Sequence, residues 1–221
     1  MMNVPALAAE IDSRLRALPA RKTEEVRAIR REFSRRIARA APREVIQLGL
    51  RLLRSPALEH RFLAYELVHH HRGALQSLRA RQLEQFGRGM NHWGAVDTFG
   101  CYLAGPAWRE NQVHDGLIHR WARSKDRWWR RAALVSTVPL NSKARGGRGD
   151  PRRTLRVCQM LVKDRDDMVV KALSWALREL AKRDPLPVRK FLTAHQKTLA
   201  ARVLREVRNK LATGLKNPRK R

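Results

Sequence analysis

The chain has 221 residues, and its 48 Lys and Arg residues against 20 Asp and Glu residues give a formal net charge of +28. That excess is larger than solubility requires and attracts polyanions, of which nucleic acid is the usual one. Hydrophobic residues make up 43% of the chain, which can supply a sizeable core for one large domain or a short array of repeats. The two cysteines, Cys101 and Cys158, exclude a disulfide framework and a cysteine metal spacing, so we expect core thiols in a reducing compartment.

The sequence also argues against a membrane protein. No apolar run approaches membrane-spanning length, and the stretch from Met1 to Asp12 lacks the basic start and long apolar centre of a signal peptide. We therefore expect a soluble, intracellular, cytoplasmic protein with no membrane partner.

Nearly every segment has the apolar spacing of a helix. The three-to-four pattern occurs at Leu15–Leu18, Val26–Ile37, Val45–Leu52, Leu63–Leu67, Leu117–Trp121, Ala132–Val135 and Leu173–Leu180. Breakers separate these segments at Pro19, Pro42, Pro56, Gly73, Gly87–Gly89, Gly105–Pro106, Pro139, Pro151 and Pro185. Paired helices of this length approach the ~40-residue period of HEAT-like repeats, which stack into a solenoid with a concave binding face. The pattern predicts an all-α chain and leaves a plain helical bundle as the alternative.

Two segments depart from this regularity and are rich in arginine. Residues 141–153 contain glycine as well and are predicted to form a mobile basic loop within a single helical domain of residues 1–209. Residues 210–221 are predicted to form a basic C-terminal tail that adds weak, salt-sensitive attraction to a polyanion.

A carboxylate stands out against this basic background. Trp93 and Asp97 are four residues apart, which on a helix places an indole and an acid on one face, one turn apart. An acid that faces a polyanion repels it and must serve another purpose. The alternative from periodicity alone is an ion pair between Asp97 and a neighbouring arginine.

Further along the chain, tryptophans occupy two predicted helices. Asp126 precedes Trp128 and Trp129 and can cap their helix, so that one of the two indoles faces the core. Trp175 lies within the later helix. Core packing is the usual role of a tryptophan, and we expect it for about half of the six in this chain.

Three motifs together resemble the AlkD-like DNA alkylation repair glycosylases. They are His92–Asp97 (HWGAVD), Asp126–Leu134 (DRWWRRAAL) and Lys171–Leu180 (KALSWALREL), in family order and spacing, and Glu59–Ala64 (EHRFLA) looks like an earlier family helix. The resemblance covers roughly residues 21–192. The resemblance does not extend to Asp167–Met168, where some relatives carry aromatic residues.

The resemblance implies a HEAT-like α-solenoid that holds duplex DNA in a concave basic groove and excises N3- and N7-alkylated purines. Its catalytic tryptophan, aspartate and arginine fall on Trp93, Asp97 and Arg131, and its second cleft tryptophan falls on Trp175. Further contacts to DNA are expected from Arg130, Lys171, Arg178, Arg145 and Arg148. Arg130 occupies a position that varies in the family.

An alkylated purine already carries a positive charge, so it leaves as a neutral base without a general acid. The remaining task is to stabilise an oxocarbenium-like sugar and to orient a water molecule, which a fixed carboxylate at Asp97 can do. Aromatic faces at Trp93 and Trp175 attract partial positive charge on the sugar, and Arg131 is expected to clamp a phosphate. The resemblance implies that the base is not flipped into a pocket.

We therefore expect a monomeric, nucleoid-associated glycosylase that needs neither a metal nor a cofactor. Two alternatives use the same scaffold. One is a non-catalytic binder of unusual DNA structures, and the other is a helical-repeat protein that binds RNA or another protein.

Overall fold

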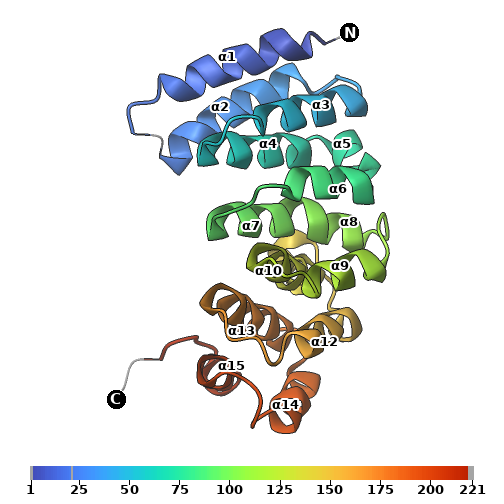
Figure 1. Cartoon of the computed structure of the whole chain (residues 1–221), viewed down its shortest axis with the longest axis vertical. Coiled ribbons are helices and arrows are strands. Elements are labelled where there is room, and N and C mark those ends of the chain that lie inside the picture. The colour runs from blue at the N-terminus through green and yellow to red at the C-terminus, as the bar shows by residue number, and fades with distance from the viewer. Residues whose placement is uncertain (1, 21, 219–221) are drawn as a thin grey trace. The chain divides into compact units, whose positions relative to one another are not determined.

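The computed structural model describes residues 2–20 and 22–218, and every regular element in these ranges is helical (Figure 1). The expected all-α class is therefore confirmed. The chain forms two compact units, Met1–Gly89 and Met90–Arg221. Each unit is described by itself below.

The first unit contains six helices within the described residues. They are α1 (Val4–Arg16), α2 (Thr23–Arg36), α3 (Pro42–Leu52), α4 (Leu58–His70), α5 (Arg72–Ser77) and α6 (Ala80–Gly87). Helix α3 packs against α1, α4, α5 and α6, and α2 packs against α4. Each helix thus contacts its near neighbours along the chain, as in a helical repeat.

Local signals explain where these helices begin. Pro42 occupies the first turn of α3, where its missing N–H leaves no hydrogen bond unmade. The break expected at Gly73 is made instead by His71, whose backbone is extended and whose Nδ1 accepts a hydrogen bond from the amide of Ala74. Gly73 itself lies inside α5.

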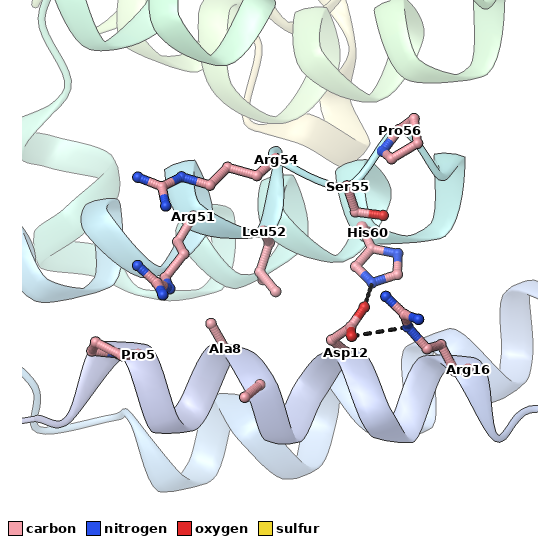
Figure 2. A pocket seen from close by; sticks show the side chains of 11 residues that line it. Pro5, Ala8, Asp12, Arg16, Arg51, Leu52, Arg54, Ser55, Pro56 and His60 are labelled. Atoms are coloured by element: carbon pink, nitrogen blue, oxygen red, sulfur yellow. Dashed lines mark hydrogen bonds and ion pairs between the residues drawn. The ribbon is translucent and has the colours of Figure 1, made fainter.

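A pocket of about 400 Å³ opens between α1 and the loop that joins α3 to α4 (Figure 2). Asp12 on α1 lines the pocket, and its carboxylate contacts His60 Nε2 at 2.8 Å and Arg16 Nε at 2.9 Å. Arg51 and Arg54 also line the pocket. The contacts of Asp12 tie α1 to the start of α4.

The second unit contains the remaining helices of the described chain. They are α7 (Trp93–Phe99), a π-helical turn (Gly100–Ala104), α8 (Gly105–Arg109), α9 (Asp115–Ala122), α10 (Arg127–Val135), α11 (Val138–Asn141), a 3₁₀ turn (Lys143–Arg145), α12 (Pro151–Met160), α13 (Asp167–Ala181), α14 (Pro185–Ala194) and α15 (Ala201–Thr213). One row runs α7, α10, α13, α15, with each helix packed on the next, and a second row runs α9, α12, α14. Two parallel rows of this kind are typical of a helical-repeat fold.

Close backbone contact holds α7 and α8 against the helices that follow. A Cβ atom at Gly100 would lie 2.7 Å from the Val135 side chain, and one at Gly105 would lie 2.7 Å from the Ser136 carbonyl oxygen. Only glycine permits this approach. It brings α7, which carries Trp93 and Asp97, directly onto α10, which carries Arg131.

The core of the second unit accounts for both cysteines and several of the tryptophans. Cys101 and Cys158 are buried and unbridged, and burial raises the pKa of the Cys101 thiol to about 12. They are core thiols, as predicted. Trp108 and Trp121 are buried, and the Trp129 ring packs on Trp121 at 4.9 Å between ring centroids.

The segment expected to be a basic loop is closed by hydrogen bonds. The buried Asn141 donates to Thr154 Oγ1 at 2.9 Å and accepts from the Asp150 amide at 3.0 Å. Its mobility stays a prediction. Helix α15 continues to Thr213, so the start of the expected tail is helical, and residues 219–221 lie outside the described part of the chain.

Candidate DNA-facing site

The site begins at the first turn of α7. His92 precedes the helix and caps it, because its Nδ1 accepts a hydrogen bond from the Gly94 amide at 3.1 Å. Trp93 and Asp97 follow on one face of the helix, one turn apart. The side chain of Trp93 stands in solvent with 52% of the residue exposed, which is unusual for so large an aromatic residue.

Arg131 on α10 binds both oxygens of the Asp97 carboxylate. Its Nε donates to Oδ1 at 2.9 Å and its Nη2 donates to Oδ2 at 2.8 Å, a bidentate pair. Its Nη1 donates to the carbonyl oxygen of Met168 at 2.5 Å. Arg131 therefore joins three successive helices of the row, since Asp97 lies on α7 and Met168 on α13.

The two members of this pair are buried unequally. The side chain of Arg131 is 6% exposed, whereas that of Asp97 is 20% exposed. Burial raises the pKa of the Asp97 carboxyl above its usual value, and the hydrogen bonds from Arg131 oppose that rise. The Asp97 carboxylate is thus the accessible member of the pair, and the Arg131 guanidinium lies beneath it.

Arg130 points away from this pair, as the 100° rotation between neighbouring helix residues requires. Its Nε donates to Asp164 Oδ2 at 2.7 Å, and its Nη1 donates to the carbonyl oxygens of Ser124 at 3.1 Å and Lys125 at 2.8 Å. Its predicted contact with DNA stays a prediction.

The predicted residues on α13 lie one helix further along the row. Trp175 is half-buried, and Lys171 pairs with Asp167 at 2.7 Å. Arg178 donates through Nε to Ser174 Oγ at 3.2 Å, and burial lowers the pKa of its guanidinium. Arg178 is thus committed to the interior of the second unit.

Two predicted contacts lie in the segment between α11 and α12. The Arg145 guanidinium lies 5.1 Å from the ring centroid of Tyr102, and the Arg145 carbonyl accepts a hydrogen bond from Arg109. Arg148 is exposed. The structure gives neither residue a contact with Trp93, Asp97, Arg131 or Trp175.

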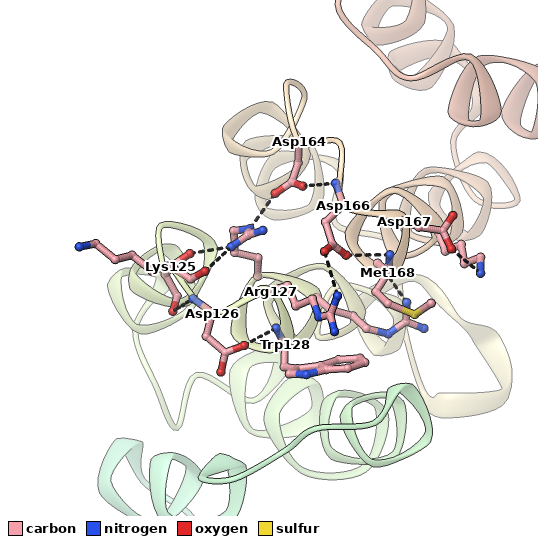
Figure 3. A network of polar contacts seen from close by, with 12 residues as sticks. Lys125, Asp126, Arg127, Trp128, Asp164, Asp166, Asp167 and Met168 are labelled. Carbon is pink, nitrogen blue, oxygen red and sulfur yellow. Dashed lines mark hydrogen bonds and ion pairs between the residues drawn. The ribbon is translucent and has the colours of Figure 1, made fainter.

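Sequence reasoning missed the segment that supports Arg131. Asp164, Asp166 and the Met168 carbonyl are each contacted by one arginine of α10, and Figure 3 draws this network of polar contacts from close by. The available signal was charge complementarity. Three aspartates lie within residues 164–167 and three arginines within residues 127–131, and two ion pairs join the two stretches.

None of the helices in the described ranges combines the length and the apolarity that a bilayer crossing requires. Comparison with curated proteins gave no match. The family described as DNA alkylation repair enzyme matches residues 18–211, which include the helices that carry Trp93, Asp97, Arg131 and Trp175. This is a family of DNA repair enzymes, and DNA is the partner that the family implies. The chain belongs to the DNA alkylation repair enzyme family.

Proposed function

We propose that this protein is a monofunctional DNA glycosylase that hydrolyses the N-glycosidic bond of N3- and N7-alkylated purines in duplex DNA. The observation that carries the proposal is the accessible Asp97 carboxylate, held from beneath by the buried Arg131 and placed one turn from the exposed Trp93. An acid in this position repels the phosphates that a basic DNA-binding surface attracts.

The chemistry follows from the charge on the substrate. Alkylation at N3 or N7 makes the purine a cationic leaving group, which departs as a neutral base when the C1′–N bond breaks. Positive charge then develops on the deoxyribose, and the fixed Asp97 carboxylate stabilises it. The same carboxylate orients the water that adds to C1′ and accepts its proton.

The remaining residues take supporting roles. The exposed face of Trp93 and the half-buried Trp175 offer aromatic surface to the sugar and its cationic character. Arg131 fixes the plane of the carboxylate through its two hydrogen bonds, and its contact with a DNA phosphate stays a prediction. The HEAT-like curvature, the groove and the action without base flipping belong to the same proposal, as do the monomeric state, the nucleoid location and the independence from metals and cofactors.

The direct test is incubation of the protein with duplex DNA methylated on its purines, followed by chromatography of the released bases. We expect release of 3-methyladenine, 7-methylguanine or both, without added metal and above the spontaneous rate. A protein that binds this DNA but releases no base above that rate would contradict the glycosylase proposal.

One observation favours a second function, the non-catalytic binding of unusual DNA structures. Both Asp97 oxygens are already occupied by Arg131, which is also what a purely structural ion pair requires. That alternative predicts tight binding of branched or damaged duplexes with no released base. Preference for duplex RNA over DNA would instead support a role in RNA binding.

A further inference from the structure

Three arginines at the start of α10 contact three successive points of the segment 164–168, as Figure 3 shows. Arg130 reaches Asp164, Arg127 reaches Asp166, and Arg131 reaches the Met168 carbonyl. The segment leads into α13. Its geometry therefore determines where the third hydrogen-bond acceptor of Arg131 lies.

Arg130 makes three hydrogen bonds. It donates to Asp164 from Nε and to the two backbone carbonyls of Ser124 and Lys125 from Nη1. Its side chain is 20% exposed and that of Asp164 is 11% exposed, so this pair is shielded from solvent. Arg130 thus fixes the end of the loop before α10 to the loop before α13.

Two hydrogen bonds connect Asp164 to Met168 within the segment 164–168. Its Oδ1 accepts a hydrogen bond from the Asp166 amide at 2.9 Å, and Asp166 Oδ1 accepts one from the Met168 amide at 2.9 Å. The second of these bonds caps α13. A continuous series of contacts therefore runs from Arg130 to the residue whose carbonyl receives Arg131.

We propose that Arg130 and Asp164 form a positioning pair, which sets the orientation of Arg131 and through it the plane of the Asp97 carboxylate. This inference rests on the proposed glycosylase activity. Neither residue touches the DNA in this role. Loss of the pair lets the segment 164–168 shift, so Arg131 can no longer satisfy Met168 and both Asp97 oxygens at once.

The competing role for Arg130 is a phosphate contact, and lysine separates the two. Lysine keeps the positive charge but lacks the planar fork that bonds a carboxylate and two carbonyls together. If Arg130 is a positioning residue, both Arg130→Lys and Arg130→Gln abolish its effect on excision. As a phosphate contact, it is largely replaced by lysine, and Arg130→Gln lowers the logarithmic salt slope of binding by about 0.9.

The experiment measures single-turnover excision at saturating protein, and salt-dependent DNA affinity, for Arg130→Lys, Arg130→Gln, Asp164→Asn and the Arg130→Gln/Asp164→Asn double variant. We expect each single variant to slow excision about 10- to 100-fold, the size of effect that a small misplacement produces, with the salt slope unchanged. The double variant should be no slower than the slower single variant, because both changes remove the same contact between Arg130 and Asp164. Arg205→Gln is the matched control, since Arg205 is exposed on α15 and lies outside both α10 and the segment 164–168.

A second readout does not depend on activity. Asp97 is faced by Arg131 from α10 and by His92 at the start of its own helix, with the Cys101 thiol further along that helix. If Arg131 loosens its hydrogen bonds, the pKa of Asp97 should rise further, as NMR of the carboxyl carbon would show in Asp164→Asn. A change in fold stability alone would leave that pKa unchanged.

The outcomes separate the two proposals. Active wild-type protein with normal excision in Arg130→Lys and Asp164→Asn overturns the positioning pair and leaves the glycosylase intact. Wild-type protein without excision overturns the glycosylase, and an unchanged Asp97 pKa in Asp164→Asn then overturns the coupling between the pair and the carboxylate. A raised Asp97 pKa with slowed excision supports both.

Discussion

Arg131 lies beneath Asp97 and binds both of its carboxylate oxygens, so the acid is held in one plane by a guanidinium that solvent barely reaches. Removing one partner of such a pair leaves the other charge buried without compensation. Stability and chemistry are therefore coupled at Asp97, and its variants must be read with both measurements.

Asp97→Asn should abolish most excision and leave DNA affinity equal or slightly higher, because it removes the charge that stabilises the sugar cation and also a repulsion from phosphate. A purely structural ion pair predicts instead a loss of about 3 kcal/mol in the free energy of unfolding, since Arg131 loses its counter-charge. Thermal unfolding and single-turnover excision per folded molecule should be measured together, below the melting temperature.

Glu110→Gln is the control, because Glu110 is an acid with a 59% exposed side chain that pairs with its neighbour Arg109 on the surface of the second unit. It should change neither excision nor stability appreciably. An Asp97→Asn protein that is destabilised but fully active per folded molecule would show that the ion pair is structural only.

Arg131→Ala should impair both excision and the binding of lesion-containing DNA. Arg130→Ala should impair binding less severely. Arg131 contacts the carboxylate directly, whereas Arg130 contacts Asp164. Rates and affinities should be compared at one fixed salt concentration. If Arg130→Ala proves the more damaging in both measurements, the assignment of the site arginine is wrong by one residue.

Excision should fall as the pH falls through the pKa of Asp97, because only the ionised carboxylate stabilises the cation. Burial raises that pKa, so the acid limb should lie above the ordinary pKa of an aspartate. The contribution of Asp97 to stability depends on pH in the opposite direction to that of most aspartates, whose folded-state pKa is lowered. The raised pKa favours the protonated folded state, so the contribution of this group is present at low pH and is lost as the pH rises through its folded-state pKa.

The measurement is single-turnover excision across pH, with the spontaneous release at each pH subtracted. The limb should disappear from any residual activity of Asp97→Asn. A limb that stays in that variant belongs to another group.

Binding should weaken steeply with salt, with a logarithmic slope near −0.9 for each neutralised phosphate. Deletion of residues 218–221 should reduce affinity modestly, and excision at saturating protein should stay the same. The deletion leaves Lys216 in place, whose Nζ lies 3.4 Å from the buried Glu206. A flat salt response would show that the charge serves a partner other than DNA.

Gly105→Ala should destabilise the second unit, because its Cβ would lie 2.7 Å from the Ser136 carbonyl oxygen and 2.8 Å from that of Gly100. Overpacking of this kind typically costs about 1–3 kcal/mol. Gly116→Ala on α9 is the control, since a Cβ there meets nothing within 4 Å, and alanine should stabilise the helix by about 0.5–1 kcal/mol. Chemical denaturation of the two variants gives the comparison.

Local signals in the sequence predicted much of the fold. Asp126 caps α10 as expected, accepting from the Trp128 amide at 2.8 Å, and Trp129 is the tryptophan that packs inward. These features depend on residues a few positions apart, so they can be read directly. The break before α5 was harder, because a histidine cap at His71 produces it rather than the nearby glycine.

Contacts across the fold were less accessible to sequence reasoning. Asp97 and Arg131 are 34 residues apart, so no local pattern connects them. Periodicity alone did not distinguish Arg131 from Arg130, and the family resemblance made that choice. Charge complementarity was the only signal for the role of Asp164, because its partner lies on another helix and aspartates before a helix are ordinary. The structure supplies the direction in which each arginine points.

The π-helical turn at Gly100–Ala104 has a consequence for how this protein tolerates length changes. Such a turn holds one residue more than an α-helix allows in the same rise, and it separates Asp97 from the anchored α8. Deleting a single residue within this turn would restore a regular α-helix, whereas deleting one from the regular helix α7 would rotate the residues before it by about 100°. The turn is therefore the place where this helix should tolerate a one-residue deletion, because Trp93 and Asp97 would keep facing Arg131.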